Sequence, residues 1–337
     1  MSITIKKIAE VSGVSRGTVD RVLNNREGVN KETADKVRRC AEALGYTPNI
    51  AGKSLAVRKK AYVIGVLLNS KGNPFFDEMI NSINDLAKEY AHYGMKVVLK
   101  QMRGFDVSTQ LEMLEELEKT ASAIILTPID DELIRNKINE LSEKNIPVVT
   151  VNTDIKNSKR LCYVGTDYKQ GGKIVAGLLA LIKPNGAKIG IVHGSKKMYG
   201  HNQRVLGFEG ELNSSGYKVL SLVQSHDDDI IAYEKTSKML SENPNIDTIF
   251  VVASGVYGVC RAVISSKKDI TILTFDDIPS TIELLEKGII KATVSQQPAF
   301  QGHKAMEIMF EYLVAKHIPL NEEYLIENQI KIKQNYR

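Results

Sequence analysis

Residues 3–25 read ITIKKIAEVSGVSRGTVDRVLNN, and this stretch predicts two short helices joined by a tight turn. Its apolar residues recur at helical spacing, interrupted once around Gly13. Gly13 tolerates the backbone conformation of a turn, and Ser15 can cap the second helix by accepting a hydrogen bond from a first-turn amide. With Val19 and Val22 turned inward, the outward face carries Arg16, Gly17, Asp20, Arg21 and Asn24. A DNA major groove admits such a helix, whose first turns would meet base edges.

A third helix is expected from about Lys31 to Leu44, with Asn30 as its N-cap and Gly45 as its stop. Its apolar positions would complete a three-helix core. The charge of this region is also distinctive: residues 1–60 contain 13 Lys and Arg against 6 Asp and Glu, whereas the rest of the chain contains 32 against 34. A basic head on a nearly neutral body is typical of a protein that binds the phosphate backbone.

The headpiece resembles the lactose/galactose repressor (LacI/GalR) family through IAEVSGVSRGTVDRVLNN at 8–25, VNKETADKVRRCAEALGYTPN at 29–49 and AGKSLA at 51–56. The resemblance implies that the second helix reads operator bases, and Arg21 is well suited to guanine. For Asp20 two interpretations stay open: it accepts a hydrogen bond from a cytosine amino group, or it pairs with a neighbouring arginine. The predicted DNA-binding residues are Thr4, Ser15, Arg16, Gly17, Thr18, Asp20, Arg21, Asn24, Asn49, Gly52, Lys53 and Leu55.

The segment 49–57, which follows Pro48, resembles the short hinge helix of that family, which is ordered only when two copies pair in the DNA minor groove. Leu55 matches the leucine that wedges between the central base pairs and kinks the duplex. Gly52 stands where an alanine is usual, and glycine costs a helix about 1 kcal/mol relative to alanine. The alternative is that the segment is an ordinary linker.

From Tyr62 onward, short apolar runs alternate with amphipathic stretches, which predicts parallel sheets flanked by helices. The predicted strands are YVIGVLL, VVL, AIIL, PVVTV, KIGIVHG, VLSLV, TIFVVAS, ITILTF and KATVSQQ. So many strands suit two similar lobes, with a ligand cleft at the carboxyl ends of the strands. The predicted domains are a helix-turn-helix headpiece at 1–47, a hinge at 48–60, and an effector-binding and dimerisation domain at 61–337. The two lobes of this effector-binding domain are predicted to be 61–164 with 296–320, and 165–295 with 321–337.

This body resembles the effector domain of the same family and the ribose-type periplasmic sugar-binding proteins, through NPFFDEM, TPID, PVVTVNTD, YVGTDY, QRVLGF, ITILTFDD and ATVSQQP. The implied fold is a small all-α headpiece plus a two-lobed α/β domain like a periplasmic binding protein. Sugar recognition needs an aromatic face and convergent hydrogen-bonding groups. The predicted ligand-binding residues are Asn69, Asn73, Phe75, Phe76, Asn152, Asp154, Arg204, Ser254, Asp276 and Gln296.

Several of these residues have a second interpretation. Phe75 and Phe76 would stack on a sugar ring or pack in the core at a helix start. Arg204 would donate two hydrogen bonds to a ligand or form a surface salt bridge. Asn152 stands where relatives often carry an acid, and Ser254 where they usually show Asn-Asp, so recognition at these two positions is expected to differ.

Two other groups of polar residues are interpreted as structural. His226, Asp227, Asp228 and Asp229 could suggest a metal site, but consecutive acids before a helix are better explained as capping and helix-dipole partners. His193 and His201 are expected to be neutral polar neighbours of the cleft. Because no nucleophile-elbow, zinc or dinucleotide fingerprint is found, we predict no enzyme, cofactor or metal.

These features predict a transcriptional repressor that binds a palindromic operator in double-stranded DNA as a homodimer, controlled by a monosaccharide or related metabolite. The apolar stretches fall short of the roughly 20 residues that span a bilayer, and no leader sequence or leucine heptad extension is recognised, so a cytoplasmic dimer without membrane contact is expected. The three cysteines, Cys40, Cys162 and Cys260, are expected to be buried reduced thiols. The alternatives are control by a partner protein, or a transport-type sugar-binding protein.

Overall fold

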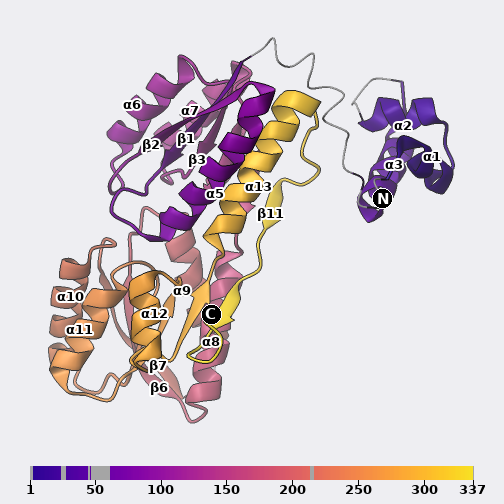
Figure 1. Ribbon diagram of the computed structural model, residues 1–337. Helices are drawn as coiled ribbons and strands as arrows, with labels where there is room; N and C mark the ends of the chain where they lie inside the picture. Colours follow the sequence, from indigo (N-terminus) through magenta and orange to yellow (C-terminus); the bar gives the residue numbers. More distant parts are fainter. Residues whose placement is uncertain (1–2, 24–27, 45, 47–60, 213–215, 337) are drawn as a thin grey trace.

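The computed structural model describes residues 3–23, 28–44, 46, 61–212 and 216–336 (Figure 1). Its first part is a bundle of three helices, α1 (Ile5–Ser12), α2 (Arg16–Leu23) and α3 (Lys31–Ala43). Their inward faces form one core, made by Ile8, Ala9, Val19, Val22, Ala34, Val37 and Ala41. The predicted third helix is therefore confirmed, and the predicted hinge lies outside the described residues.

The turn between α1 and α2 forms as the sequence predicts. Gly13 ends α1 in the left-handed region, where φ is 68° and glycine meets no steric penalty. The hydroxyl of Ser15 then accepts a hydrogen bond of 3.0 Å from the amide of Thr18. The carboxamide oxygen of Asn30 accepts a bond of 2.8 Å from the amide of Thr33, at the start of α3. These caps satisfy amides that helix geometry leaves free.

The rest of the chain forms two lobes, each built on a six-stranded sheet (Figure 1). The first sheet has the strand order β11-β5-β4-β3-β1-β2, and the second has the order β12-β10-β9-β8-β6-β7. The strands of the first sheet are β1 (Tyr62–Leu68), β2 (Met95–Gln101), β3 (Ala123–Leu126), β4 (Val148–Asn152), β5 (Cys162–Gly165) and β11 (Glu323–Leu325). Those of the second sheet are β6 (Ala187–His193), β7 (Tyr217–Gln224), β8 (Thr248–Val251), β9 (Thr271–Phe275), β10 (Ala292–Ser295) and β12 (Gln329–Lys331).

All paired strands are parallel except β12, which runs antiparallel to β10. Parallel strands need long crossovers, and helices supply them on both faces of each sheet. The helical segments of the first lobe are α5 (Phe75–Tyr90), η1 (Ala91–Tyr93), α6 (Val107–Glu118), α7 (Glu132–Glu143), α13 (Pro298–Phe310) and η2 (Glu311–Ala315). Those of the second lobe are α8 (Tyr168–Ile182), α9 (Tyr199–Glu211), α10 (Asp229–Glu242), α11 (Val256–Ser266) and α12 (Pro279–Glu286).

Each sheet has a hydrophobic core on either face. In the first lobe α5 and α13 pack on one face, where the rings of Tyr90 and Phe310 stack with centroids 3.9 Å apart, and α6 and α7 cover the other. In the second lobe α8 and α9 pack on one face, and α10, α11 and α12 on the other. These layers fix the carboxyl ends of both sheets as two facing edges.

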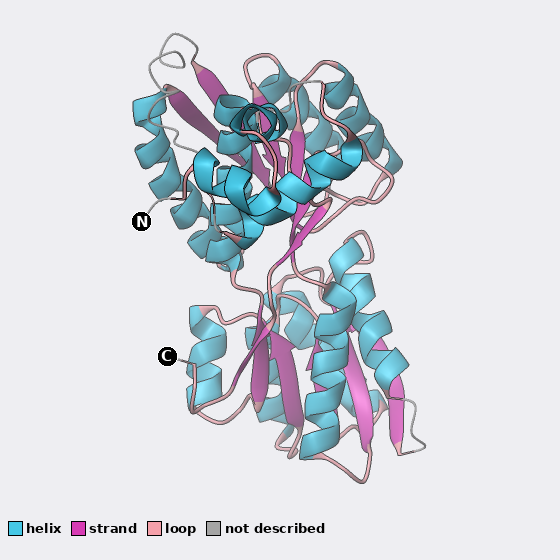
Figure 2. Cartoon of the chain, turned by 90° about the vertical axis from the view of Figure 1, so that its right-hand side faces the viewer, coloured by secondary structure: helices cyan, strands magenta, loops and turns pink. Residues whose placement is uncertain are grey.

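The sheet order shows that the chain passes between the lobes after β5, after β10 and after β11. Figure 2 shows the two lobes one above the other, with connecting segments between them. The first two passages agree with the predicted boundaries, but the predicted last crossing at Leu320 is wrong. Glu323–Leu325 pairs with β5 in the first sheet, and only Gln329–Lys331 pairs in the second. Three strands of the final topology, β5, β11 and β12, were absent from the predicted set. Two of them span three residues each at a sheet edge, which is too short for a strand pattern to be recognised.

Candidate functional site

The headpiece presents a polar helix face to solvent. Val19 and Val22 of α2 are buried, whereas Arg16, Gly17 and Arg21 are exposed on the opposite face. Thr18 and Asp20 are partly buried beside them. The hydroxyl of Thr4 accepts a hydrogen bond from the amide of Lys7 and caps α1. This is the arrangement that lets one helix enter a major groove.

Of the predicted DNA-binding residues, Asn24, Asn49, Gly52, Lys53 and Leu55 lie outside the described residues.

The two lobes face each other across a cleft lined by both. Asn69, Asn73, Phe75, Phe76 and Asn152 come from the first lobe, and Arg204, Ser254, Asp276 and Gln296 from the carboxyl-end side of the second. The structure thus brings together every predicted ligand-binding residue except Asp154. Asn152 ends β4 and Asp276 directly follows β9, and both have left-handed backbones, with φ values of 66° and 68°. Such strained positions are often found at functional sites.

The guanidinium of Arg204 is fixed inside the cleft wall rather than at the surface. The side chain is 2% exposed, and Nη1 donates a hydrogen bond of 2.6 Å to the backbone oxygen of Val252. Its carbon lies 3.8 Å from the centroid of the Phe275 ring and 5.0 Å from that of Tyr168. Nε of Arg204 is buried and has no partner among the described residues. A surface salt bridge, the alternative interpretation, is therefore wrong.

Asp276 and Gln296 form a connected pair beside this arginine. Nε2 of Gln296 donates a hydrogen bond of 2.6 Å to Oδ1 of Asp276, and the hydroxyl of Thr166 donates at 3.4 Å to Oε1 of Gln296. Burial raises the pKa of Asp276 to about 6, although Arg204 and Gln296 oppose the rise. The pair links the end of β9 to the start of the passage into the first lobe.

The first lobe contributes aromatic rings and amides. Phe75 and Phe76 begin α5 with their rings edge to face, 5.1 Å apart. Both rings are buried in the core of the first lobe and also line the cleft, so packing and contact with the cleft are compatible. Oδ1 of Asn69 accepts a hydrogen bond of 3.0 Å from Gln110, while Nδ2 of Asn69 is buried without a partner among the described residues.

Asp154 lies away from the cleft and has a different environment from the one predicted. Its two oxygens accept hydrogen bonds of 2.6 and 2.8 Å from Arg160, and Thr150 donates a third of 2.9 Å. Burial alone would raise the pKa of Asp154, but the contacts with Arg160 outweigh it and the pKa is lowered. Nη1 of Arg160 also donates to the backbone oxygen of Glu322. Asp154 therefore anchors the edge of the first sheet, where β11 joins β5.

The three acids at the start of α10 have three different roles. Asp228 caps α10 as expected, accepting bonds of 2.8 and 3.0 Å from the amides of Ile230 and Ile231. The carboxylate of Asp229 accepts a bond of 3.0 Å from the amide of Gly258. Asp227 instead lines the cleft, which the sequence reasoning missed because all three acids fit the pattern of a helix cap. The sequence reasoning also did not single out the lining residues Phe105, Tyr168 and Met198.

The two histidines near the cleft are neutral groups, as expected. Nε2 of His193 lies 3.1 Å from the side-chain oxygen of Asn202, and Nδ1 of His201 accepts a bond of 3.1 Å from the amide of Ser195. Burial lowers the pKa of both imidazoles, and that of His201 most strongly. Within the described parts of the chain, no group of three or more His, Cys, Asp or Glu side chains is suited to a metal ion.

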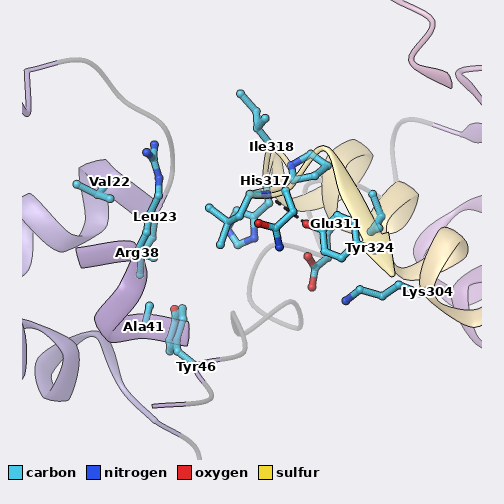
Figure 3. Close-up of a pocket in the computed structure, with 14 residues that line it drawn as sticks. Val22, Leu23, Arg38, Ala41, Tyr46, Lys304, Glu311, His317, Ile318 and Tyr324 are labelled. Atoms are coloured by element: carbon cyan, nitrogen blue, oxygen red, sulfur yellow. Dashed lines mark hydrogen bonds between the residues drawn. The ribbon is translucent and has the colours of Figure 1, made fainter. Parts of the chain in front are cut away.

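A second hollow of about 270 Å³ lies between the headpiece and the first lobe (Figure 3). Val22, Arg38 and Tyr46 line one wall, and Glu311 and Tyr324 are on the other. These walls belong to parts of the chain joined through residues 47–60, outside the described residues. We assign it no site.

A helix-turn-helix headpiece attached to a two-lobed α/β domain defines a class: DNA-binding regulators of two parts. Family comparisons identify this class more closely. Residues 4–49 match the model described as "Bacterial regulatory proteins, lacI family", and residues 64–317 match "Periplasmic binding protein domain". The chain belongs to the lacI family, and it is a DNA-binding transcriptional regulator.

Individual relatives agree with this assignment. The HTH-type transcriptional regulator MalR of Streptococcus pneumoniae is 26% identical over 94% of this chain and 99% of that protein. Catabolite control protein A of Priestia megaterium is 27% identical over 93% of both chains. Among solved structures, GanP, a glucose-galactose binding protein from Geobacillus stearothermophilus, has a TM-score of 0.76 and 28% identity, covering 82% of this chain and 99% of that one.

In the described residues no helix is both long and apolar enough to cross a bilayer.

Proposed function

We propose that this protein is a repressor that binds a palindromic operator as a homodimer and is controlled by a small sugar-like molecule bound between its lobes. The observation that carries the proposal is the cleft itself. Aromatic rings of α5 face amide, guanidinium and carboxyl groups of the second lobe, which suits the apolar faces and hydroxyls of a sugar. The glucose-galactose binding protein of similar fold supports a carbohydrate ligand.

Control of DNA binding would follow from movement of the lobes. The free space between the cleft side chains is about 40 Å³, which admits water but no hexose, so ligand entry requires the lobes to separate. A ligand that touches both lobes would stabilise one relative orientation. The headpiece joins the first lobe through residues 47–60, and a change in the lobes of a dimer would alter the spacing of the two headpieces. We place this regulator in the cytoplasm, where its DNA is, and assign it no catalysis.

A thermal-shift screen of the purified protein against pentoses, hexoses, polyols, sugar phosphates and purines tests the ligand. We expect a compound that raises the melting temperature by several degrees. Repeating the hit on Arg204→Ala tests the site, because that variant removes a buried cleft donor. Arg261→Ala is the matched control, since Arg261 is an exposed arginine on α11 outside the cleft lining.

The expected result is a shift that disappears in Arg204→Ala and persists in Arg261→Ala, with circular dichroism confirming that both variants are folded. A screen without any shift, or a shift that survives in Arg204→Ala, would contradict the proposal.

Sedimentation of the complex with a selected operator tests the homodimer: two chains per palindrome are expected, and one chain per palindrome would refute it.

A further inference from the structure

The charged groups of the cleft lie on the wall of the second lobe. Arg204 is the only cation among the described lining residues, and it is accompanied by two carboxyl groups, Asp227 and Asp276. All three come from the second lobe, on α9, on the loop between β7 and α10, and directly after β9. Carboxylates therefore outnumber cations on this wall.

The three groups differ in their present partners. Nη1 of Arg204 donates to Val252, and Oδ1 of Asp276 accepts from Gln296. The carboxyl group of Asp227 has one hydrogen bond, from the backbone amide of Ser254, whereas its Oδ1 is buried without a hydrogen-bond partner among the described residues. A buried polar atom without a partner is costly, and at the wall of a cleft a ligand can supply the missing hydrogen bond.

The backbone around Asp227 holds it in this position. His226 and Asp227 both have left-handed backbones, with φ values of 53° and 61°. The amide of Asp227 donates a bond of 3.3 Å to the hydroxyl of Ser225. Across from it, Gly194 makes room, because a Cβ there would come within 2.5 Å of Oδ1 of Asp227. Strain of this kind persists only where the surrounding structure enforces it.

The imidazole of His201 lies beside Asp227. A Cβ on Gly194 would also come within 2.6 Å of Nδ1 of His201, so the imidazole and the carboxyl group flank the same glycine. Nδ1 accepts from the amide of Ser195 and burial keeps the ring neutral, which places the ring proton on Nε2. An acceptor beside a donor suits a hydroxyl, which both donates and accepts.

We propose that Asp227 and His201 are specificity-determining residues that together take a hydroxyl or amino group of the cleft ligand, and that the ligand is a sugar or polyol without phosphate or carboxylate. Asp227 needs a donor and repels an anion, since two carboxylates already face one guanidinium in a buried cleft. This inference rests on the proposed function, because it names the class of effector that the same cleft takes.

Isothermal titration with matched sets of one sugar tests the inference. Each set contains the parent sugar, its phosphate, its uronate and its amino sugar: glucose, glucose 6-phosphate, glucuronate and glucosamine, with the corresponding galactose set, and ribose with ribose 5-phosphate. In a set that binds, we expect the neutral or amino member to bind about tenfold or more tightly than either anion. An anion that binds as tightly as its parent, with binding lost in Arg204→Ala, overturns the inference and leaves the proposed function standing. No binding by any member overturns both.

The variant Asp227→Asn separates charge from shape. It keeps the size of the side chain and one acceptor oxygen but removes the negative charge. The parent sugar should therefore bind about tenfold more weakly, and the difference in affinity between the parent sugar and its anionic derivatives should become smaller. Asp228→Asn is the matched control, because Asp228 is an exposed cap of α10, and its selectivity should equal that of the wild type. Unchanged selectivity in Asp227→Asn would refute the role of this carboxyl group.

Discussion

The contact between α8 and α9 leaves no room for a side chain at Gly172, and this position controls where Arg204 lies. A Cβ built on Gly172 would come within 2.0 Å of the backbone oxygen of Arg204 and 2.8 Å of the amide of Phe208. The packing is reciprocal, since a Cβ on Gly207 of α9 would come within 2.0 Å of the backbone oxygen of Lys169 in α8. The two helices therefore meet backbone to backbone.

The substitution Gly172→Ala forces these helices apart. Because real Cβ contacts stay above 3.0 Å, α9 would have to move by about 1 Å or more at Arg204. That movement disturbs the stacking of the guanidinium 3.8 Å above Phe275. Overpacking of this kind costs about 1–3 kcal/mol, and it exceeds the gain of about 1 kcal/mol that alanine brings to a helix interior.

Gly177→Ala in the same helix is the control, since a Cβ at Gly177 meets nothing within 4 Å. We expect Gly177→Ala to stabilise the protein by about 0.5–1 kcal/mol, and Gly172→Ala to destabilise it and weaken ligand binding. Urea unfolding followed by circular dichroism at 222 nm, the usual wavelength for helix, measures the first effect, and titration with the cleft ligand measures the second. Equal stability and equal ligand affinity of the two variants would refute the argument.

Three further variants test other parts of the structure. Arg21→Ala should weaken binding to a selected operator by about 1–3 kcal/mol and to scrambled DNA much less, as measured by fluorescence anisotropy; equal losses on both would contradict base readout. Arg160→Ala removes the bidentate partner of buried Asp154 and leaves Lys156, 3.3 Å away, as its remaining cation, so thermal unfolding should show a loss of about 1–3 kcal/mol, and a wild-type melting curve would contradict this. Burial raises the pKa of Asp227 from 3.8 to about 7, so the native state loses stability as pH rises between these values. Asp227→Asn should therefore be more stable than the wild type by on the order of 3 kcal/mol at pH 8, with a smaller difference at pH 5. Urea unfolding at both pH values measures this difference in stability, and a difference that does not change with pH would contradict the prediction.

The headpiece and the general plan of the lobes could be predicted from the sequence, because they depend on local signals. Helical spacing around Val19 and Val22, a glycine turn and two polar N-caps define the three helices. Buried parallel strands appear as apolar runs separated by helices, so the α/β class follows from the pattern alone. The short strands β11 and β12 carry no such pattern, and their places depend on which edge they reach in three dimensions.

The cleft was predicted less completely, for reasons that lie in the backbone. Asn152 ends β4 and Asp154 follows two residues later, yet only Asn152 lines the cleft, while Asp154 pairs with Arg160 at the sheet edge. Asp227 and Asp228 are adjacent, yet one lies in the cleft and the other caps α10. In both places residues in the left-handed region redirect the chain, and no sequence pattern distinguishes them from ordinary loop residues.

The central claim is that occupancy of the inter-lobe cleft controls DNA binding, and one titration tests it directly. An operator is first selected from random duplexes by the purified protein, and its affinity is then measured by fluorescence anisotropy with and without the cleft ligand. The account predicts that saturating ligand changes the operator affinity by about fivefold or more in the wild type and leaves it unchanged in Arg204→Ala. An operator affinity that stays constant while calorimetry shows the cleft to be saturated would contradict the account.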